Sequence, residues 1–422
     1  MDILYQIIGV FLSLWWLWLP VALFSAFIEL WTKYLKAKAV KKINWILLEV
    51  KVPRDVQRTP KSMEQIFAGL HGVQTKIKFW DKYWKGKVQE WFSLEIAGID
   101  GGVYFFVRTP EQYRNLVEAQ IYAQYPGAEI HETLDYAGPL ASKVPSKNFD
   151  IAGVELVLAR DDFYPLRTYP QFEEKEEERR VDPIAAFLEI LSKLKPSENI
   201  FVQYIVKPLS FDEEKKIKEA AQAQIDKMHG RRKEAKKGFF GNFSGEAAEF
   251  MLNLAKGAFV FPEWAERKSD EKAEKQLTLS PGEKLVAEGV EAKVSKLLFK
   301  SSIRFAYIAR SDVFNKANIA AVLGAFKQFN TVNMNGFKPN SDVGTSADYP
   351  FFKKRREYLK KKNFIERFIK RKWPSKPKGK DFTLNAEELA TVYHYPLVVV
   401  KAPTLRHVES KKAEPPVSLP VG

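Results

Sequence analysis

The chain has 422 residues, of which 45% are hydrophobic and 28% charged, so it can bury substantial cores and is too polar for a polytopic membrane protein. It contains no Cys, which excludes disulfides, cysteine zinc sites, iron–sulfur clusters and thiol catalysis. The five His show none of the short spacings of a zinc site, and we expect neither a metal nor a cofactor. The formal net charge of +15 indicates an anionic partner, either nucleic acid or a membrane surface.

The N-terminus has the pattern of a membrane anchor. Residues 3–28 contain no charged side chain over 26 positions, and a helix of that length would span about 39 Å, more than the ~30 Å hydrocarbon core of a bilayer. A cleaved signal peptide fits less well, because the chain starts Met1-Asp2 and the apolar run is too long. Five lysines follow the span: Lys33, Lys36, Lys38, Lys41 and Lys42. The positive-inside rule therefore predicts that residues 1–43 are a single-pass anchor with a basic juxtamembrane segment, and that the bulk of the chain is cytoplasmic.

Residues 44–150 follow the order β-α-β-β-α-β. A β-rich run at 45–52 precedes a helix with proline at its first position, Pro60, and the turn at 98–102 joins two alternating strands. The capping box at 109–112 predicts the second helix, and a last strand follows at 128–134. This order is that of a ferredoxin-like unit, so the predicted fold class is α+β.

A similar order returns over residues 151–340, which we predict to be a second ferredoxin-like domain. Its helices open at Asp182-Pro183 and at a capping box over 280–283. The main difference is an insertion at 208–279, which begins as a charged helix and continues through an aromatic stretch at 239–264. That stretch is either a lid folded on its own domain or an exposed hairpin that touches the membrane or a partner.

Most of the positive charge lies in one segment. Residues 353–380 hold 14 Lys or Arg against two Glu. We treat the region 341–382 as a basic helix and linker. A stripe of Phe351, Tyr358, Ile365, Phe368 and Lys372 predicts an amphipathic basic helix within it. The candidate binding residues for nucleic acid or anionic lipid are Lys353, Lys354, Arg355, Arg356, Lys360, Lys361, Lys362, Lys370, Arg371 and Lys372.

Three interpretations of this basic segment stay open. The lysines and arginines can hold DNA phosphates through counterion release. They can instead lie on the anionic inner leaflet of the membrane, or the segment can be a solvated linker. Interleaved aromatic residues do not decide between them, because aromatic rings stack on bases and also enter lipid headgroups.

The sequence shows no catalytic motif. The two Gly-Lys pairs, Gly86-Lys87 and Gly379-Lys380, lack the other residues of a phosphate-binding P-loop. No His-Glu-x-x-His, Gly-x-Ser-x-Gly or kinase-type glycine loop is present. We therefore expect a protein that is not an enzyme.

Several longer stretches carry a family resemblance. At the C-terminus they are 383–396 (TLNAEELATVYHYP), 402–405 (APTL), 409–416 (ESKKAEPP) and 419–422 (LPVG). Upstream they are 49–53 (EVKVP), 63–72 (MEQIFAGLHG), 117–126 (VEAQIYAQYP), 324–330 (GAFKQFN) and 335–339 (NGFKP). Together they resemble the uncharacterised N-terminal region, and the segment leading into the motor domain, of bacterial type IV secretion and conjugation ATPases of the HerA/FtsK class. The versions from small-genome candidate-phyla bacteria are the most similar.

The resemblance implies a place beside a DNA-translocation machine in the bacterial cytoplasmic (inner) membrane. In that family a P-loop motor follows this region, whereas residues 383–422 end about where the motor would begin. The resemblance therefore implies a motor ATPase supplied in trans or by a continuation, and a homo-oligomer, since motors of this class are commonly rings. The expected function is a non-catalytic component that anchors and assembles the machine and guides DNA. The alternative is a membrane-tethered nucleic-acid-binding protein with no motor partner.

Overall fold

The computed structural model describes residues 13, 15–53, 59–172, 182–229, 279–347, 351–374 and 378–396. Three predictions lie wholly or partly outside these residues. They are the first part of the anchor (3–12), the aromatic stretch of the insertion (239–264) and the end of the C-terminal segment (397–422).

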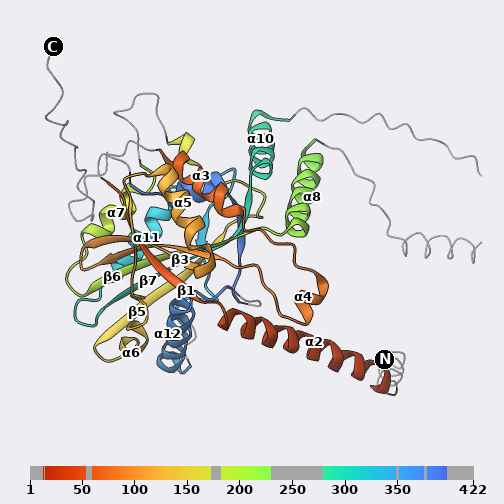
Figure 1. The fold of residues 1–422 in the computed structure, drawn as a ribbon, viewed down its shortest axis with the longest axis horizontal. Coiled ribbons are helices and arrows are strands. Elements are labelled where there is room, and N and C mark those ends of the chain that lie inside the picture. Colours follow the sequence, from red (N-terminus) through yellow and green to blue (C-terminus); the bar gives the residue numbers. More distant parts are fainter. Residues whose placement is uncertain are drawn as a thin grey trace, which may run out of the picture.

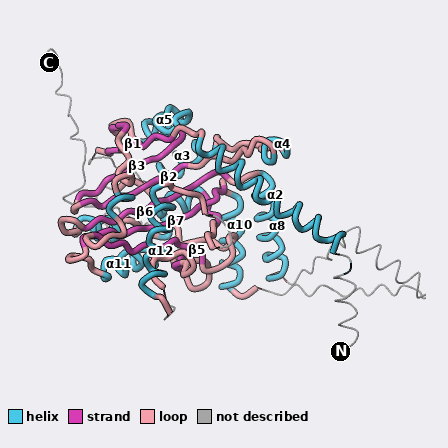
Figure 2. Tube along the Cα trace, turned by 90° about the horizontal axis from the view of Figure 1, so that it is seen from below, coloured by secondary structure: helices cyan, strands magenta, loops and turns pink. Residues whose placement is uncertain are grey.

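The predicted α+β class is confirmed. In the described residues nine strands form one sheet in the order β4-β1-β3-β2-β6-β7-β5-β8, with β9 paired to β7, and every strand pair is antiparallel. Figure 1 shows the fold, and Figure 2 shows the strands as one layer. The sheet is therefore shared by both halves of the chain.

The first half of the chain contributes the four strands that run from one edge of the sheet to its centre. Their spatial order is fourth, first, third, second along the chain. The elements of this half are β1 (Trp45–Lys51), α3 (Pro60–His71), α4 (Phe79–Tyr83), β2 (Phe92–Ile99), β3 (Gly102–Pro110), α5 (Arg114–Gln124), β4 (Glu129–Glu132) and α6 (Leu140–Lys143).

The strands of the second half have the reverse spatial order: second, third, first, fourth. Its own second strand, β6, therefore lies at the centre of the sheet beside β2. Two helices stand between its second and third strands: α8 is the first part of the predicted insertion and α10 follows the insertion, and they pack on each other through Ala221, Val286 and Val290. The elements are β5 (Phe149–Leu158), α7 (Ala185–Ser192), β6 (Glu198–Pro208), α8 (Phe211–Met228), α10 (Pro281–Ser295), β7 (Leu298–Arg310), α11 (Lys316–Lys327) and β8 (Phe337–Pro339).

Two predicted helix starts have different outcomes. The capping box at Ser280 is present, with Ser280 Oγ accepting from the Glu283 backbone N–H at 3.3 Å. The box at Thr109 does not form, because β3 runs on to Pro110 and pairs with Trp45, so α5 begins only at Arg114 after a short 3₁₀ turn. Strand pairing thus overrides a local capping signal.

One face of the sheet is covered by helices. Alternate side chains of the strands, such as Leu48, Leu94 and Phe305, meet the apolar faces of α3, α5, α7 and α11 in one large core. Figure 1 shows α3 and α5 on this side of the sheet and α12 (Lys353–Ile369) on the other. The period of two in the strands and of 3.6 in the helices accounts for this arrangement.

The segment expected to lead toward a motor domain begins inside this core. β9 (Phe382–Asn385) pairs with β7, and α13 (Ala386–Val392) packs beside α3. Asn385 and Glu388 form a reciprocal capping box at the start of α13. Tyr393 and Tyr395 are buried, so residues 382–396 are part of the fold and do not form a separate appendage.

The N-terminal helix α2 (Trp15–Lys41) leaves the body of the protein beside β1 (Figure 1). It exposes many large apolar side chains, among them Trp16, Leu23 and Phe24. Across the part of the chain that the structure describes, no helix has the length and apolarity needed to cross a bilayer.

The second face of the sheet is covered by α12. Phe364, Ile365 and Phe368 of this helix pack against Ile151, Phe201 and Ile308 of the strands. The contact is close at Gly153 of β5, where an added Cβ would lie 2.3 Å from the Phe364 ring and 2.9 Å from the Phe305 carbonyl oxygen.

Gly153→Ala is therefore expected to push α12 off the sheet and to lower the free energy of unfolding by about 1–3 kcal/mol, the usual cost of overpacking. The comparison is with Gly324→Ala in α11, where an added Cβ meets nothing within 4 Å. That control should be neutral or slightly stabilising, because alanine is the better helix former. Urea unfolding followed by tryptophan fluorescence measures both variants, and equal midpoints would contradict the close packing at Gly153.

Candidate nucleic-acid interface

Four polar side chains stand side by side across the second face of the sheet. The strand register pairs Glu95 of β2 with Gln203 of β6, Gln203 with Arg304 of β7, and Arg304 with Glu155 of β5. Each is no more than 1% exposed, and we call the four the polar row. Charged groups buried this deeply are unfavourable unless they are paired, so the polar row indicates a docking position for polar groups.

The C-terminal end of α12 occupies that position. Arg304 donates to the carbonyl oxygens of Arg367 and Lys372 at 3.0 and 2.8 Å, and Gln203 donates to that of Phe368 at 3.2 Å. The last carbonyls of a helix have no partner within the helix and carry its partial negative charge. The guanidinium of Arg304 places a positive charge at this end, where the Arg367 carbonyl oxygen also accepts from the Lys372 backbone N–H at 3.0 Å.

Glu155 supplies the negative charge that pairs with two arginines at this contact. Its carboxylate lies 3.3 Å from the Arg304 guanidinium and also accepts from Arg367 on α12. Burial lowers the pKa of Arg304 to about 10, against the raising effect of Glu155. Arg304 thus stays charged at neutral pH, and α12 is fixed by ion pairs as well as by its apolar side chains.

Arg371 is also part of this docking, and the prediction that it is a surface binding residue is wrong, because its side chain is buried. It follows α12 in a left-handed conformation (φ 44°), which turns its side chain into the sheet. Its Nε and Nη2 donate to the two carboxylate oxygens of Glu95 at 2.9 and 3.0 Å, and Nη1 pairs with Asp135. Burial alone would lower the pKa of Arg371, but Glu95, Tyr136 and Asp135 outweigh it and hold that pKa well above its usual value.

The other half of α12 stands clear of the sheet and carries most of the predicted binding residues. Lys353, Lys354, Arg355 and Arg356 occupy consecutive exposed positions, and Lys362 is exposed two turns later. We call these five residues the basic arm. Because the far end of the same helix is fixed on the polar row, the basic arm is held in a defined place.

The remaining predicted residues lie near the middle of α12 or past its C-terminal end. Lys360 donates to the Ser346 carbonyl oxygen at 2.6 Å, and Lys361 pairs with Asp150 at 2.5 Å. Lys370 pairs with Glu366 on the solvent side, and Lys372 is exposed just after α12. The structure therefore brings five of the ten together in one exposed group and assigns Arg371 to the interior.

The predicted apolar stripe of α12 is only partly right. Ile365 and Phe368 are buried together with Phe364, but Tyr358 is 52% exposed, and Phe351, which precedes the helix, is 75% exposed. The interpretation of this helix as a solvated linker is wrong, since it packs on the sheet. Exposed rings among exposed cations suit either stacked bases or lipid headgroups.

The residues that dock α12 were missed by the sequence analysis. A signal was present, because Glu95, Glu155, Gln203 and Arg304 each lie between two apolar or aromatic residues of a strand. Burial of such a residue without a partner costs free energy, so its presence in a core indicates a specific partner. The strand register was needed to show that the four form one row.

A second polar feature is a cavity of about 140 Å³ between α10 and α13. Its charged groups pair with one another: Lys293 with Glu388 at 3.1 Å, and Lys296 with Glu387 and with Glu64. These pairs join α10 and α3 to α13, so they hold the C-terminal segment in place. Within the described ranges, no group of three or more His, Asp or Glu is arranged to hold a metal ion.

The geometry defines an α+β protein whose antiparallel sheet carries helices on one face and a docked basic helix on the other. Residues 33–405 match the family described as "Domain of unknown function (DUF8128)", and the chain belongs to this family. None of the curated proteins matches the chain. The family description names no activity, partner or cellular location.

Proposed function

We propose that the protein is a membrane-anchored, non-catalytic component of a type IV secretion or conjugation machine, in which its basic arm guides DNA. The observation that carries the proposal is the fixed position of the basic arm. Four consecutive cations, Lys353 to Arg356, project from a helix whose other end is held by ion pairs at the polar row. A rigidly placed group of cations is suited to hold a phosphate backbone in a constant position.

The topology supports the interpretation of the two halves as ferredoxin-like units. Each half has the order of a split β-α-β unit, and the two units share one sheet through β2 and β6. In this proposal a homo-oligomer of the chain forms the membrane-proximal part of the machine, and a P-loop motor ATPase in trans supplies the energy. The support for these partners is the sequence resemblance given above.

The proposed anchor is the N-terminal segment, in the cytoplasmic membrane of a bacterium with most of the chain on the cytoplasmic side. It is supported by the uncharged run at 3–28 and by the lysines that follow it. Figures 1 and 2 show that the outer end of α2 and the free end of α12 point in different directions. That arrangement favours DNA over lipid as the partner of the basic arm.

The charge-neutralised variant K353Q/K354Q/R355Q tests the basic arm. We expect its affinity for duplex DNA to fall at least tenfold, and the slope of log K against log salt to shrink by roughly 3, since each phosphate contact contributes about 0.9. Fluorescence anisotropy of a labelled duplex at several salt concentrations measures both quantities on the full chain in detergent.

The matched control is K284Q/K316Q/K327Q, which removes three exposed lysines from α10 and α11 and leaves α12 intact. It has the same net charge and should bind DNA like the wild type. If both variants lose the same affinity, only the overall charge matters and the arm has no special role. Binding of the basic arm to anionic vesicles but not to DNA would show that its partner is the membrane surface and would contradict the DNA-guiding role. Absence of a motor ATPase among proteins that co-purify from the native membrane would favour the membrane-tethered DNA-binding alternative.

A further inference from the structure

Three large aromatic side chains are exposed on the short helix α4 and at the residue that caps its C-terminal end, Trp84. Phe79, Trp80 and Trp84 are 67%, 65% and 66% exposed. Their rings contact one another and Tyr83, with Trp80 and Trp84 5.0 Å apart and Phe79 and Tyr83 4.5 Å apart. Aromatic rings gathered on the surface and kept out of the core indicate a surface for interaction.

The α4 helix is held against α2. Gly86, just after α4, has a φ of 65°, and an added Cβ there would lie 2.5 Å from the Leu35 carbonyl group of α2. Figures 1 and 2 both show α4 beside this part of α2. Glycine allows this backbone contact because it adopts a positive φ and has no side chain. The aromatic rings of α4 are therefore placed by the fold.

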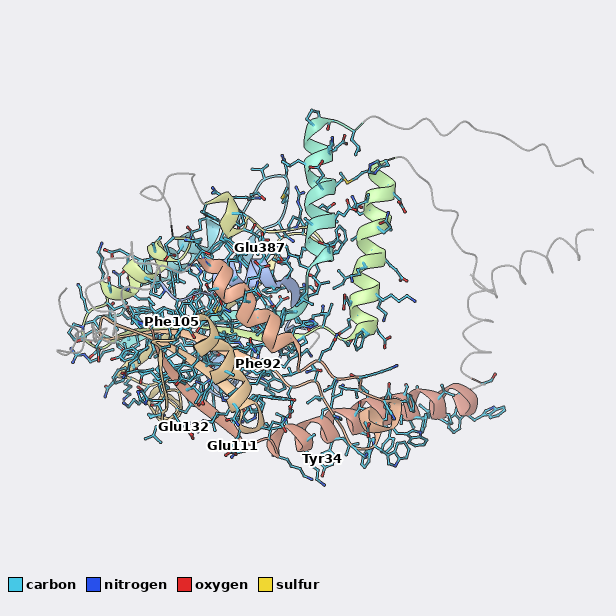
Figure 3. The ribbon with its side chains drawn as sticks, turned by 45° about the horizontal axis from the view of Figure 1, so that its top comes forward. Tyr34, Phe92, Phe105, Glu111, Glu132 and Glu387 are labelled. Carbon is cyan, nitrogen blue, oxygen red and sulfur yellow. The ribbon has the colours of Figure 1, made fainter. Side chains whose placement is uncertain are left out.

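The adjoining part of α2 continues the same kind of surface. Phe27, Trp31 and Tyr34 form a chain of ring contacts at 6.0 and 6.1 Å, and they are 55%, 40% and 58% exposed. Figure 3 shows Tyr34 on α2, well apart from Phe92 and Phe105 in the sheet. Together with Phe79, Trp80 and Trp84 these residues form a surface that we call the aromatic belt.

Cations surround the aromatic belt. Residues 76–87 contain five lysines and one aspartate, Asp81, which pairs with Lys85 at 2.9 Å. On α2, Glu29 lies between Phe27 and Trp31 and pairs with Lys33 at 2.5 Å, and the last turns of the helix add the exposed lysines Lys38 and Lys41. Tryptophan and tyrosine concentrate at the level of lipid headgroups, and lysine side chains reach from there to phosphate.

We propose that the aromatic belt and its lysines bind the headgroup layer of an anionic bilayer, so that the protein meets the membrane at α4 as well as through α2. This inference rests on the membrane attachment in the proposed function. A protein partner would explain the rings but not the excess of lysine over acidic residues around them, whereas an anionic lipid surface explains both. Contact at two elements would fix the tilt and rotation of the sheet above the membrane, and with them the direction of the basic arm.

The absence of Cys from the natural chain makes a direct test possible. A nitroxide label is placed at Lys85→Cys, beside the belt, or at Val332→Cys, a 91% exposed position between α11 and β8. The full chain is bound to vesicles of phosphatidylcholine and phosphatidylglycerol. Collisions of the label with oxygen, which concentrates in lipid, are compared with collisions with a water-soluble nickel chelate. We expect the label at 85 to lose at least threefold in nickel collisions on binding and the label at 332 to stay unchanged.

A second variant separates the belt from the anchor. Adding F79S/W80S/W84S to Lys85→Cys should return the label to water while the protein still floats with the vesicles. If the protein floats but the label at 85 is in water without these substitutions, the inference is wrong and the anchor stands. If the protein does not float at all, the membrane attachment in the proposed function is wrong, and the belt with it.

Discussion

Glu95→Gln is expected to lower the free energy of unfolding by about 3–5 kcal/mol, because it leaves the buried guanidinium of Arg371 without its main counter-charge. Both side chains are 0% exposed and share two hydrogen bonds. Ser93 and Tyr136 also donate to Glu95, so the amide would face donors on every side. Among the residues that the structure describes, Asp135 is the other acid that contacts Arg371, and its side chain is 38% exposed. Urea unfolding of the full chain measures the loss.

Two further variants show whether the loss comes from the unpaired charge. Glu366→Gln on the solvent side of α12 also breaks a carboxylate–lysine pair, but exposed pairs contribute little, so its effect should stay within a few tenths of a kcal/mol. The double variant Glu95→Met/Arg371→Met removes both buried charges and should recover at least half of the loss. A double variant as unstable as Glu95→Gln would show that the shape of the site, and not the stranded charge, sets the cost.

Much of the fold could be predicted from sequence, because most helices and strands have a recognisable pattern of apolar residues within their own segment. Period-two strands such as Phe92–Ile99 and helices with an apolar stripe such as Pro60–His71 lie where the pattern places them. The short strand β8 begins only at Phe337, because the residues before it form a turn in which the Thr331 N–H donates to the Asn335 carbonyl oxygen. Local patterns carry no information on such turns.

The docking of α12 could not be predicted, because it depends on the register of four strands. Glu95 and Arg371 are 276 positions apart in the chain. Arg371 belongs to a run of three basic residues, Lys370 to Lys372, and nothing in that run distinguishes the buried one. The exposed part of the arm was predictable, since a dense run of cations cannot be buried without partners.

Lys293→Met is expected to lower the free energy of unfolding by about 3–5 kcal/mol at neutral pH, because it leaves the buried carboxylate of Glu388 without its counter-charge. Both side chains are 0% exposed and lie 3.1 Å apart. Lys293 also donates to the Tyr164 carbonyl oxygen at 3.1 Å, and Glu388 accepts from the backbone N–H groups of Leu166 and Asn385 at 2.8 Å. The pair therefore joins α10 to the start of α13, and its loss should loosen the C-terminal segment.

The pH dependence of this loss identifies its source. Burial raises the pKa of Glu388 even with Lys293 present, and removal of Lys293 should raise it further. A carboxyl whose folded pKa lies above its unfolded value stabilises the fold most below the unfolded value, near 4.3. Stability is then lost as pH rises toward the folded pKa, at up to about 1.4 kcal/mol per unit. The deficit of Lys293→Met relative to wild type should therefore be smaller at pH 5 than at pH 8.

Two companion variants complete this test. Adding Glu388→Gln to Lys293→Met should remove the pH dependence, because the titrating carboxyl is gone. Lys296→Met, one turn further along, should cost little, since its side chain is 36% exposed and its contacts with Glu387 and Glu64 lie at the rim. A deficit of Lys293→Met that is equal at both pH values would mean that lost packing around the lysine stem, and not the charge on Glu388, holds the C-terminal segment to the core.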